Sequence, residues 1–157
     1  MATTTGTRAA ADFPVFKPSG AGLVCAAYGY HDFAANPTAA DILALCKVPA
    51  GAVVIDGLVR IEDIDTNATE ELDIDVGYAA NGAVAADPDA FGNFGVLNGD
   101  AVTNYLPEGG TLLPFNGVLG NGPLAFTAET TITATINVDA ATFAAGTITV
   151  VAYYVVP

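Results

Sequence analysis

The feature that most constrains this chain is a regular alternation of side chains over positions 47–62, KVPAGAVVIDGLVRIE. After a Pro-Ala-Gly turn, one set of alternate positions, 53 to 61, reads Val, Ile, Gly, Val, Ile. The other set, from Val54 to Glu62, mixes Val and Leu with Asp, Arg and Glu. Successive side chains of a β-strand point to opposite faces, so this spacing predicts a long strand with one dry face and one mixed face.

Further segments have the composition and the period of strands: 22–30, 41–48, 72–76, 130–138 and 147–156. In the fourth of these, the even positions from Ile132 to Val138 are apolar, and the odd positions are threonine or asparagine. That pattern predicts one core face and one solvent face. The periodicity of 41–48 fits a helix as well as a strand, and its length and the turn after it favour a strand.

Residues 77–123 are dense in Gly, Asn, Pro and Asp, and predict long loops with two or three short strands. We find no internal repeat and no segment that predicts a helix. Short strands separated by turn residues indicate an all-β fold, namely a β-sandwich, for which a jelly roll is one fitting topology. We expect a single β-sandwich domain over 21–157, preceded by an extended N-terminal arm over 1–20.

Two apolar features predict a contact surface. Two prolines keep the segment 13–18 out of a helix, and it carries Phe13 and Phe16, so it fits either a frayed tail or an arm that docks both rings on a neighbouring subunit. The strand at 147–156 ends apolar on both faces, with Val151, Tyr153 and Val155 on one of them. Such a strand end is expected to be covered by the N-terminal region or by another subunit.

The charge balance excludes whole classes of partner. The chain has 17 acidic residues against 4 Lys and Arg, a formal net charge of −13. Such a surface repels phosphate backbones and anionic lipids, so we expect neither nucleic-acid binding nor membrane binding. The simplest role of this charge is to keep a concentrated protein in solution.

The two cysteines predict buried free thiols. Cys25 and Cys46 each lie within an apolar run, where a thiol behaves as a small hydrophobic group, although a disulfide between neighbouring strands is the alternative. The N-terminal residues lack the apolar region of a signal peptide, and no run approaches the roughly 18 apolar residues of a membrane span. We therefore expect synthesis in a cytoplasm, where thiols stay reduced.

No pattern predicts an enzyme. The single histidine, His31, stands beside Asp32, but no serine or cysteine is placed with it as an activated nucleophile. A histidine in ordinary hydrogen bonding is the simpler interpretation. No glycine-rich loop joins a strand to a helix, so we predict neither a nucleotide site nor any other cofactor.

The acidic segment raises the question of a calcium site. Positions 63–67, Asp-Ile-Asp-Thr-Asn, have the spacing that opens an EF-hand loop. Ala68 then replaces the turn glycine, and Ile74 replaces the bidentate glutamate. A looser set of oxygen ligands remains conceivable, from Asp63 and Asp65 with Glu70 or Glu71, or from Asp87 and Asp89. The expected interpretation is a solvated acidic face, with no metal.

The stretch 45–77, LCKVPAGAVVIDGLVRIEDIDTNATEELDIDVG, resembles small virion proteins of tailed bacteriophages that are encoded near the major capsid gene. The segments 130–136 (TTITATI) and 146–153 (GTITVVAY) continue the resemblance. It implies a head decoration (cement) protein without catalytic residues, made in the host cytoplasm and located on the capsid exterior. It also implies the major capsid protein as partner and a homo-oligomer, most often a trimer.

Two other functions fit the same residues. A tail or head-fibre component would contact host glycans through aromatic side chains of the loop region, such as Phe91, Phe94 and Tyr105. A free-standing β-sandwich module would bind calcium or carbohydrate and would be stabilised by its ligand.

Overall fold

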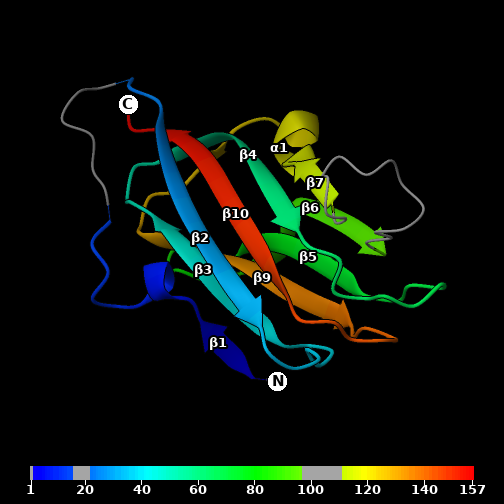
Figure 1. The fold of residues 1–157 in the computed structure, drawn as a ribbon. Coiled ribbons are helices and arrows are strands. Elements are labelled where there is room, and N and C mark those ends of the chain that lie inside the picture. The colour runs from blue at the N-terminus through cyan, green and yellow to red at the C-terminus, as the bar shows by residue number, and fades with distance from the viewer. Residues whose placement is uncertain (1, 16–21, 97–110) are drawn as a thin grey trace.

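We describe the fold from a computed structural model, in which residues 2–15, 22–96 and 111–157 are described (Figure 1). Nearly all of the regular structure is β-strand. The elements are β1 (Thr3–Thr5), the 3₁₀ helix η1 (Thr7–Ala9), β2 (Cys25–Phe33), β3 (Ile42–Val48), β4 (Val53–Ile61), β5 (Asp73–Tyr78), β6 (Asp87–Val96), β7 (Thr111–Pro114), α1 (Asn116–Asn121), β8 (Leu124–Ala125), β9 (Thr130–Val138) and β10 (Gly146–Val155).

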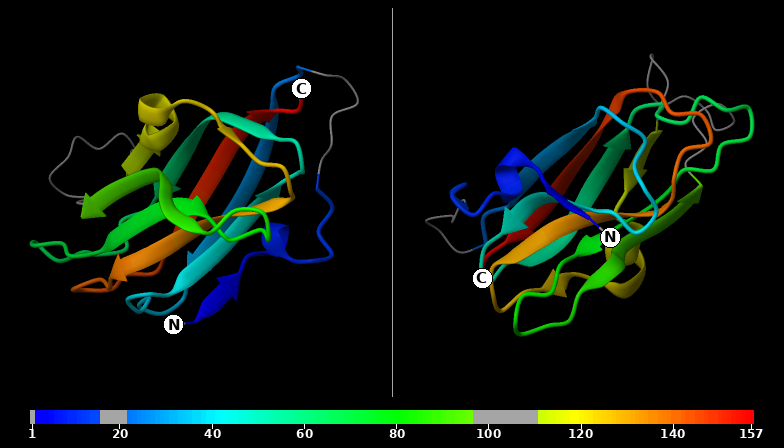
Figure 2. Two further views of the ribbon diagram at one scale, coloured as in Figure 1. Left: turned by 180° about the vertical axis from the view of Figure 1, so that it is seen from behind. Right: turned by 90° about the horizontal axis from the view of Figure 1, so that it is seen from below.

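The strands form two sheets that pack face to face (Figures 1 and 2). The β10 sheet has the order β2-β10-β4-β7, with β8 also paired to β4, and the β9 sheet has the order β1-β3-β9-β5-β6. Without the short strands β1 and β8, eight strands remain. Counted along the chain, they lie in the orders 1-8-3-6 and 2-7-4-5, which is the winding of a jelly roll. The predicted β-sandwich is confirmed.

The alternation in the sequence accounts for the two faces of each sheet. In β9, Ile132, Ala134 and Ile136 are fully buried, as their spacing predicts. Thr133, in the middle of this central strand, is buried as well, whereas the end of the strand at Asn137 is exposed. Burying one apolar face of each sheet against the other supplies the main driving force for this fold.

In β4 the predicted dry face is right for only part of the strand. Val59 and Ile61 are buried as expected, but Val53 and Ile55 are half-buried, and Val54 from the other set is fully buried. The reason is a β-bulge: β10 pairs Tyr153 with Asp56 and Tyr154 with Val54, so Ile55 is left without an opposite residue. One extra residue moves every side chain before it to the other face.

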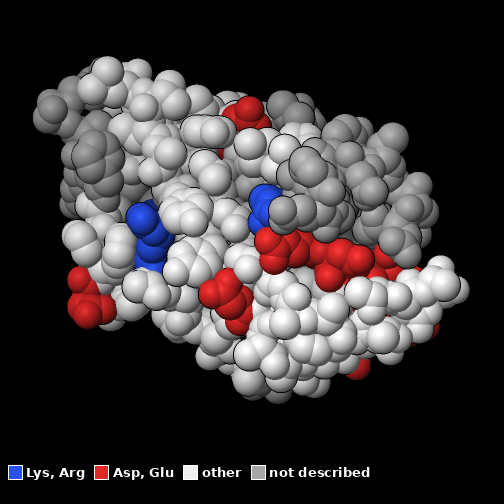
Figure 3. Space-filling model, viewed as in Figure 1, with Lys and Arg blue, Asp and Glu red and all other residues white. Residues whose placement is uncertain are grey.

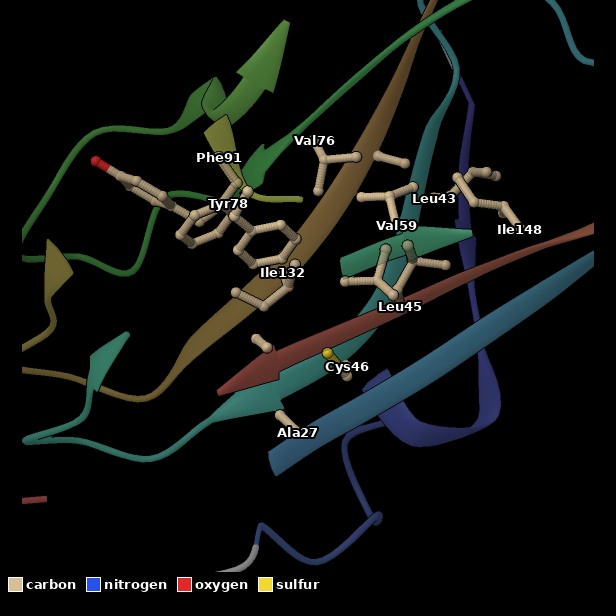
Figure 4. Packing of buried hydrophobic residues seen from close by; sticks show 14 of the residues in the cluster. Ala27, Leu43, Leu45, Cys46, Val59, Val76, Tyr78, Phe91, Ile132 and Ile148 are labelled. Carbon is tan, nitrogen blue, oxygen red and sulfur yellow. The ribbon is translucent and has the colours of Figure 1, made fainter. Parts of the chain in front are cut away.

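The core lies between the sheets (Figure 4). Aliphatic side chains such as Leu45 from β3 and Ile148 from β10 fill one part of it. Aromatic rings fill another part, where Phe91 stacks on Phe115 with ring centroids 4.6 Å apart. Tyr78 packs edge-on against Phe126 at 4.9 Å.

The region 77–123 contains more regular structure than its composition predicts. Of its residues, 87–96 form the ten-residue strand β6, and 116–121 form the short helix α1, although no helix was expected. A helix of six residues is too short to produce a recognisable 3.6-residue period. The described part of the chain contains no helix with the length and apolar composition of a membrane span.

The N-terminal segment packs against its own chain. β1 pairs in parallel with β3 at the edge of the β9 sheet, and the Gly6 amide donates a hydrogen bond of 2.7 Å to the Ala44 carbonyl oxygen. Ala9 in η1 is buried. Residues 2–15 therefore extend the sandwich, and a further contact of residues 1–20 with a neighbouring subunit stays a prediction.

The backbones of the two sheets come into contact where β2 passes β3. Gly29 faces inward there, and a Cβ atom added to it would overlap the carbonyl oxygen of Leu45. Glycine is the residue that allows this approach. Cys25 and Cys46, which lie on these two strands, are both free thiols and both buried.

Candidate interaction surface

The outer face of the β10 sheet carries a group of apolar and aromatic side chains that no described element covers fully. We call this group the tyrosine face. Its members are Tyr28 and Tyr30 of β2, Val151, Tyr153 and Val155 of β10, Leu58 of β4 and Leu112 of β7. Tyr28, Tyr30 and Leu112 are each about two-fifths exposed, at 38%, 42% and 38%.

The register of the sheet aligns these side chains. Val151, on the central strand β10, lies opposite Tyr28 on one side and opposite Leu58 on the other. The rings of Tyr28 and Tyr30 tilt toward each other, with centroids 6.1 Å apart. Directly opposed side chains on one face of a sheet stand within contact distance, so they form a continuous row across three strands.

Charged groups around the tyrosine face are few and mostly paired. Arg60 Nη1 lies 3.1 Å from Glu62 Oε1, and the hydroxyl of Thr147 donates a 2.8 Å hydrogen bond to Asp32. In the space-filling view of this side, uncharged atoms occupy much of the described surface, and several acidic side chains form a band on its right (Figure 3). The register also places Asp56 on this face, opposite Tyr153.

The N-terminal segment covers one edge of the tyrosine face. The guanidinium carbon of Arg8 lies 4.8 Å from the ring centroid of Tyr28 and 5.2 Å from that of Phe13, a cation–π arrangement with both rings. Beneath Arg8 is a small cavity of about 60 Å³, lined in part by Phe13, Tyr28, Lys47 and Tyr154. The segment therefore closes over a gap between β2 and β3.

The structure locates most of the predicted interface residues on one side of the molecule. Val151, Tyr153 and Val155 lie in line along β10 and are half-buried, and Phe13 lies at the edge beneath Arg8. Phe16 lies outside the described residues. Whether these residues form an interface stays a prediction. The sequence did not assign Tyr28 and Tyr30 to this surface, because the pairing of β2 with β10 cannot be read from either strand alone.

The candidate calcium ligands have different surroundings. Asp65 is buried, and its carboxylate accepts five backbone hydrogen bonds, from the amides of Asn67, Glu71, Leu72, Ala141 and Thr142, at 2.8–3.3 Å. Its lone pairs are thus directed at amides of the chain. Burial by itself raises the pKa of Asp65, but the backbone hydrogen bonds outweigh it and lower the pKa to about 2.

The other acidic candidates do not gather around Asp65. Asp87 and Asp89 lie together on β6, where burial and the neighbouring Asp89 raise the pKa of Asp87. Asp63 lies beyond the end of β4 and is half-buried. In residues 2–15, 22–96 and 111–157, no three His, Cys, Asp or Glu side chains come together as ligands for a metal ion.

The single histidine lies beside a cavity of about 230 Å³, at the end of β2. His31 packs edge-on against Phe33 with ring centroids 4.9 Å apart. Burial lowers the pKa of His31, and the charge of Asp32 partly opposes this. Neither cysteine contributes to this cavity. Its polar lining comes from His31, Thr4, Asp32, Asn36 and Asp41, and Thr4 supplies a hydroxyl group.

The aromatic residues proposed for glycan contact differ in their exposure. Phe91 is fully buried and stacks on Phe115, so its expected exposure was wrong, and Phe94 is partly buried against the core. Tyr105 lies outside the described residues. Phe91 is buried because β6 is a full strand of the sheet and not a loop.

No protein-family model matches this sequence, and no curated protein is similar to it. Solved structures do share its fold. A chain in the capsid of Ralstonia phage GP4 is 18% identical with a TM-score of 0.74, and the match covers 99% of this chain and 98% of that chain. A chain in the capsid asymmetric unit of cyanophage Pam1 is 23% identical with a TM-score of 0.59, covering 94% of this chain and 96% of that one.

A third similar chain comes from the acidic stable capsid structure of Helicobacter pylori bacteriophage KHP30, with 15% identity, a TM-score of 0.53, and coverage of 88% of this chain and 92% of that one. All three matches run over nearly the whole length of both chains. The fold of this protein is therefore that of chains found in phage capsids.

Proposed function

We propose that this chain is a phage virion protein, namely a capsid decoration (cement) protein that stabilises the head by bridging neighbouring capsomers. The observation that carries the proposal is the tyrosine face, a row of apolar and aromatic side chains that no described element covers fully, on a strongly acidic chain. Exposed apolar patches of this kind mark interaction sites. The shared fold with phage capsid chains gives the proposed partner, the major capsid protein.

A decoration protein acts through the area that it buries. Each copy that contacts two capsomers adds contacts that must break before the shell opens under the pressure of its DNA. This task requires a rigid body and a complementary surface, and it requires no active site. A stiff sandwich with Val151 and Tyr153 on a central strand meets both requirements, because central strands move little relative to their sheet.

In this proposal the protein assembles as a trimer where three capsomers meet. The tyrosine face and residues 1–20 lie in contacts with the neighbouring copy and with the shell. The remaining surface, with its excess of carboxylates, faces the solvent outside the capsid. Its charge keeps it from the packaged DNA and keeps free copies apart until they bind.

The test is the mass of the purified protein in solution, together with its binding to heads of the encoding virus prepared without this chain. We would compare the whole chain, a form lacking residues 1–20, and a double variant Val151→Ser with Tyr153→Ser. The control is Val138→Ser, because Val138 is an exposed valine (39%) that lies at the end of β9, in the other sheet.

We expect the whole chain and Val138→Ser to form trimers and to bind the heads, and the double variant to stay monomeric and unbound with an unchanged circular dichroism spectrum. A monomeric whole chain that ignores the heads would refute the proposal. Equal binding by the double variant would refute the role of the tyrosine face.

A further inference from the structure

The outer face of the β9 sheet, opposite the tyrosine face, carries three aspartates close together. Ile74 and Val76 of β5 point into the core, so Asp73 and Asp75, which alternate with them, point outward. Asp89 of the neighbouring strand β6 lies near enough for its charge to act on Asp75. The left view of Figure 2 shows β5, β6 and β9 from this side.

Asp75 is unusual among these carboxylates because it is buried. Its side chain belongs to a residue only 7% exposed, and in the described structure its Oδ1 atom has no hydrogen-bond partner. A buried polar atom without a partner is costly, and the cost is larger for a charged group. Buried unpartnered groups of this kind are rare in folded proteins and point to something that completes them.

The surroundings of Asp75 offer little compensation. Across the strands its register neighbours are Asn93 and Thr135. Asn137 is the one neighbour whose hydrogen bonding lowers its pKa; burial and the charges of Asp73 and Asp89 act the other way and raise it overall. The Asn137 amide also donates a 3.3 Å hydrogen bond to Asp73.

The described part of the chain supplies no cation to this group. Arg8 lies over Tyr28 and Phe13, Lys47 pairs with Glu129 at 3.2 Å, and Arg60 pairs with Glu62. A calcium ion takes six to eight oxygen ligands at about 2.3–2.6 Å, and the described carboxylates do not converge in that way. A guanidinium or ammonium group would supply both the positive charge and the N–H donors that these carboxylates lack.

We propose that Asp75, with Asp73 and Asp89, forms a receptor for the guanidinium or ammonium group of an arginine or lysine side chain of another protein. The planar guanidinium has five N–H donors and pairs with carboxylates through two hydrogen bonds at once, so arginine is the preferred ligand. The cation binds beside Asp75, against the more exposed carboxylates of Asp73 and Asp89, and offsets the repulsion between the three groups. This inference does not depend on the role in a capsid.

The test uses a model ligand, the peptide acetyl-Gly-Arg-Gly-amide, and a neutral analogue in which citrulline replaces arginine. The backbone amide signals of Asn93 and Thr135 are followed by NMR during titration of the whole protein at pH 7. Variants are Asp75→Asn and, as a control that removes one exposed charge elsewhere, Asp12→Asn. A second titration uses calcium chloride alone.

We expect a saturable shift with the arginine peptide, with an affinity of about millimolar, in the wild-type protein and in Asp12→Asn. We expect no saturable shift with the citrulline peptide or in Asp75→Asn, whose thermal unfolding shows that it is folded. The absence of a shift in the wild type, equal shifts with both peptides, or a saturable response to calcium alone would each overturn the proposal.

Discussion

Asp65 and Thr142 are 77 positions apart in the sequence, and the carboxylate of the first accepts a 2.9 Å hydrogen bond from the backbone amide of the second. Four further amides donate to the same carboxylate. It thus joins the loop between β4 and β5 to the loop between β9 and β10. A side chain that the sequence offered as a metal ligand proves to be an anchor for two loops.

We predict that Asp65→Asn destabilises the protein. The carboxylate has a pKa of about 2 in the folded state against 3.8 for a free side chain, which corresponds to about 2 kcal/mol of stability at neutral pH. Because this pKa is lowered, the contribution is present above pH 3.8 and is lost as the pH falls toward 2. Thermal unfolding should show a melting temperature roughly 4–8 °C lower at pH 7.

The control for this variant is Asp139→Asn, which removes the same charge from an exposed position at the start of the loop between β9 and β10. It should melt within about 2 °C of the wild type, since isolated surface changes cost little. The difference between Asp65→Asn and the wild type should shrink between pH 4 and pH 2. A difference in melting temperature that does not change with pH would show that the negative charge of Asp65 is not what stabilises the two loops.

We predict the opposite effect for Asp75→Asn. Burial and two neighbouring carboxylates raise the pKa of Asp75, so in the isolated protein the charged form costs stability. Because this pKa is raised, stability falls as the pH rises from 3.8 through the folded-state pKa, and the cost is complete above it. The variant should therefore melt above the wild type at pH 7, and its advantage should vanish toward pH 3.8. A lower melting temperature at pH 7 would contradict this account.

We predict that Gly29→Ala is strongly destabilising. The added methyl group would overlap the carbonyl oxygen of Leu45, and both backbones are held in their sheets. We expect a loss of at least about 3 kcal/mol, seen as insoluble expression or a melting temperature lower by roughly 6–12 °C. The matched control is Gly120→Ala in α1, where nothing lies within 4 Å of the new atom. That variant should be neutral or slightly stabilising, because alanine favours a helix.

We predict that neither thiol reacts in the folded protein. Burial raises the pKa of Cys46 to about 12, although the charge of Arg8 acts in the other direction, so the reactive thiolate is scarce at pH 8. Cys25 is also buried, with its Sγ 3.6 Å from the carbonyl oxygen of Leu23. Ellman's reagent should release two equivalents per chain in denaturant and almost none without it. Immediate reaction of Cys46 in buffer would show that the corner between β2 and β3 opens readily.

The sequence predicts the fold class and most strands because alternation is a local property. Ile132, Ala134 and Ile136 are two residues apart, and any strand that buries one of them buries all three. The same reasoning fails at Ile55, because a bulge depends on the partner strand and not on the bulged segment. Reasoning from alternation also fails at Phe91, because the glycine and polar residues on either side of Ala90 and Phe91 are typical of a loop.

The candidate sites depend on residues that are distant in the sequence, and this limits what a single chain can predict. Val151 and Tyr153 could be proposed as interface residues because the segment 147–156 ends with apolar side chains on both faces. Their alignment with Tyr28 and Leu58 required the order of the sheet. Asp65 and Asp75 lie in the same acidic stretch, and each directly follows an Asp-Ile pair. One is fully hydrogen-bonded and the other has an unpartnered oxygen, and only tertiary structure distinguishes them.

The position of β10 between β2 and β4 has a consequence for biosynthesis. Cys25 pairs with Tyr154, and Val54 pairs with Tyr154 from the other side, so the centre of this sheet is empty until residues 146–155 have left the ribosome. Folding must then close loops of more than a hundred residues, which is slow for a β-protein. A chain interrupted before residue 146 lacks the strand that joins β2 to β4, so it cannot complete this sheet.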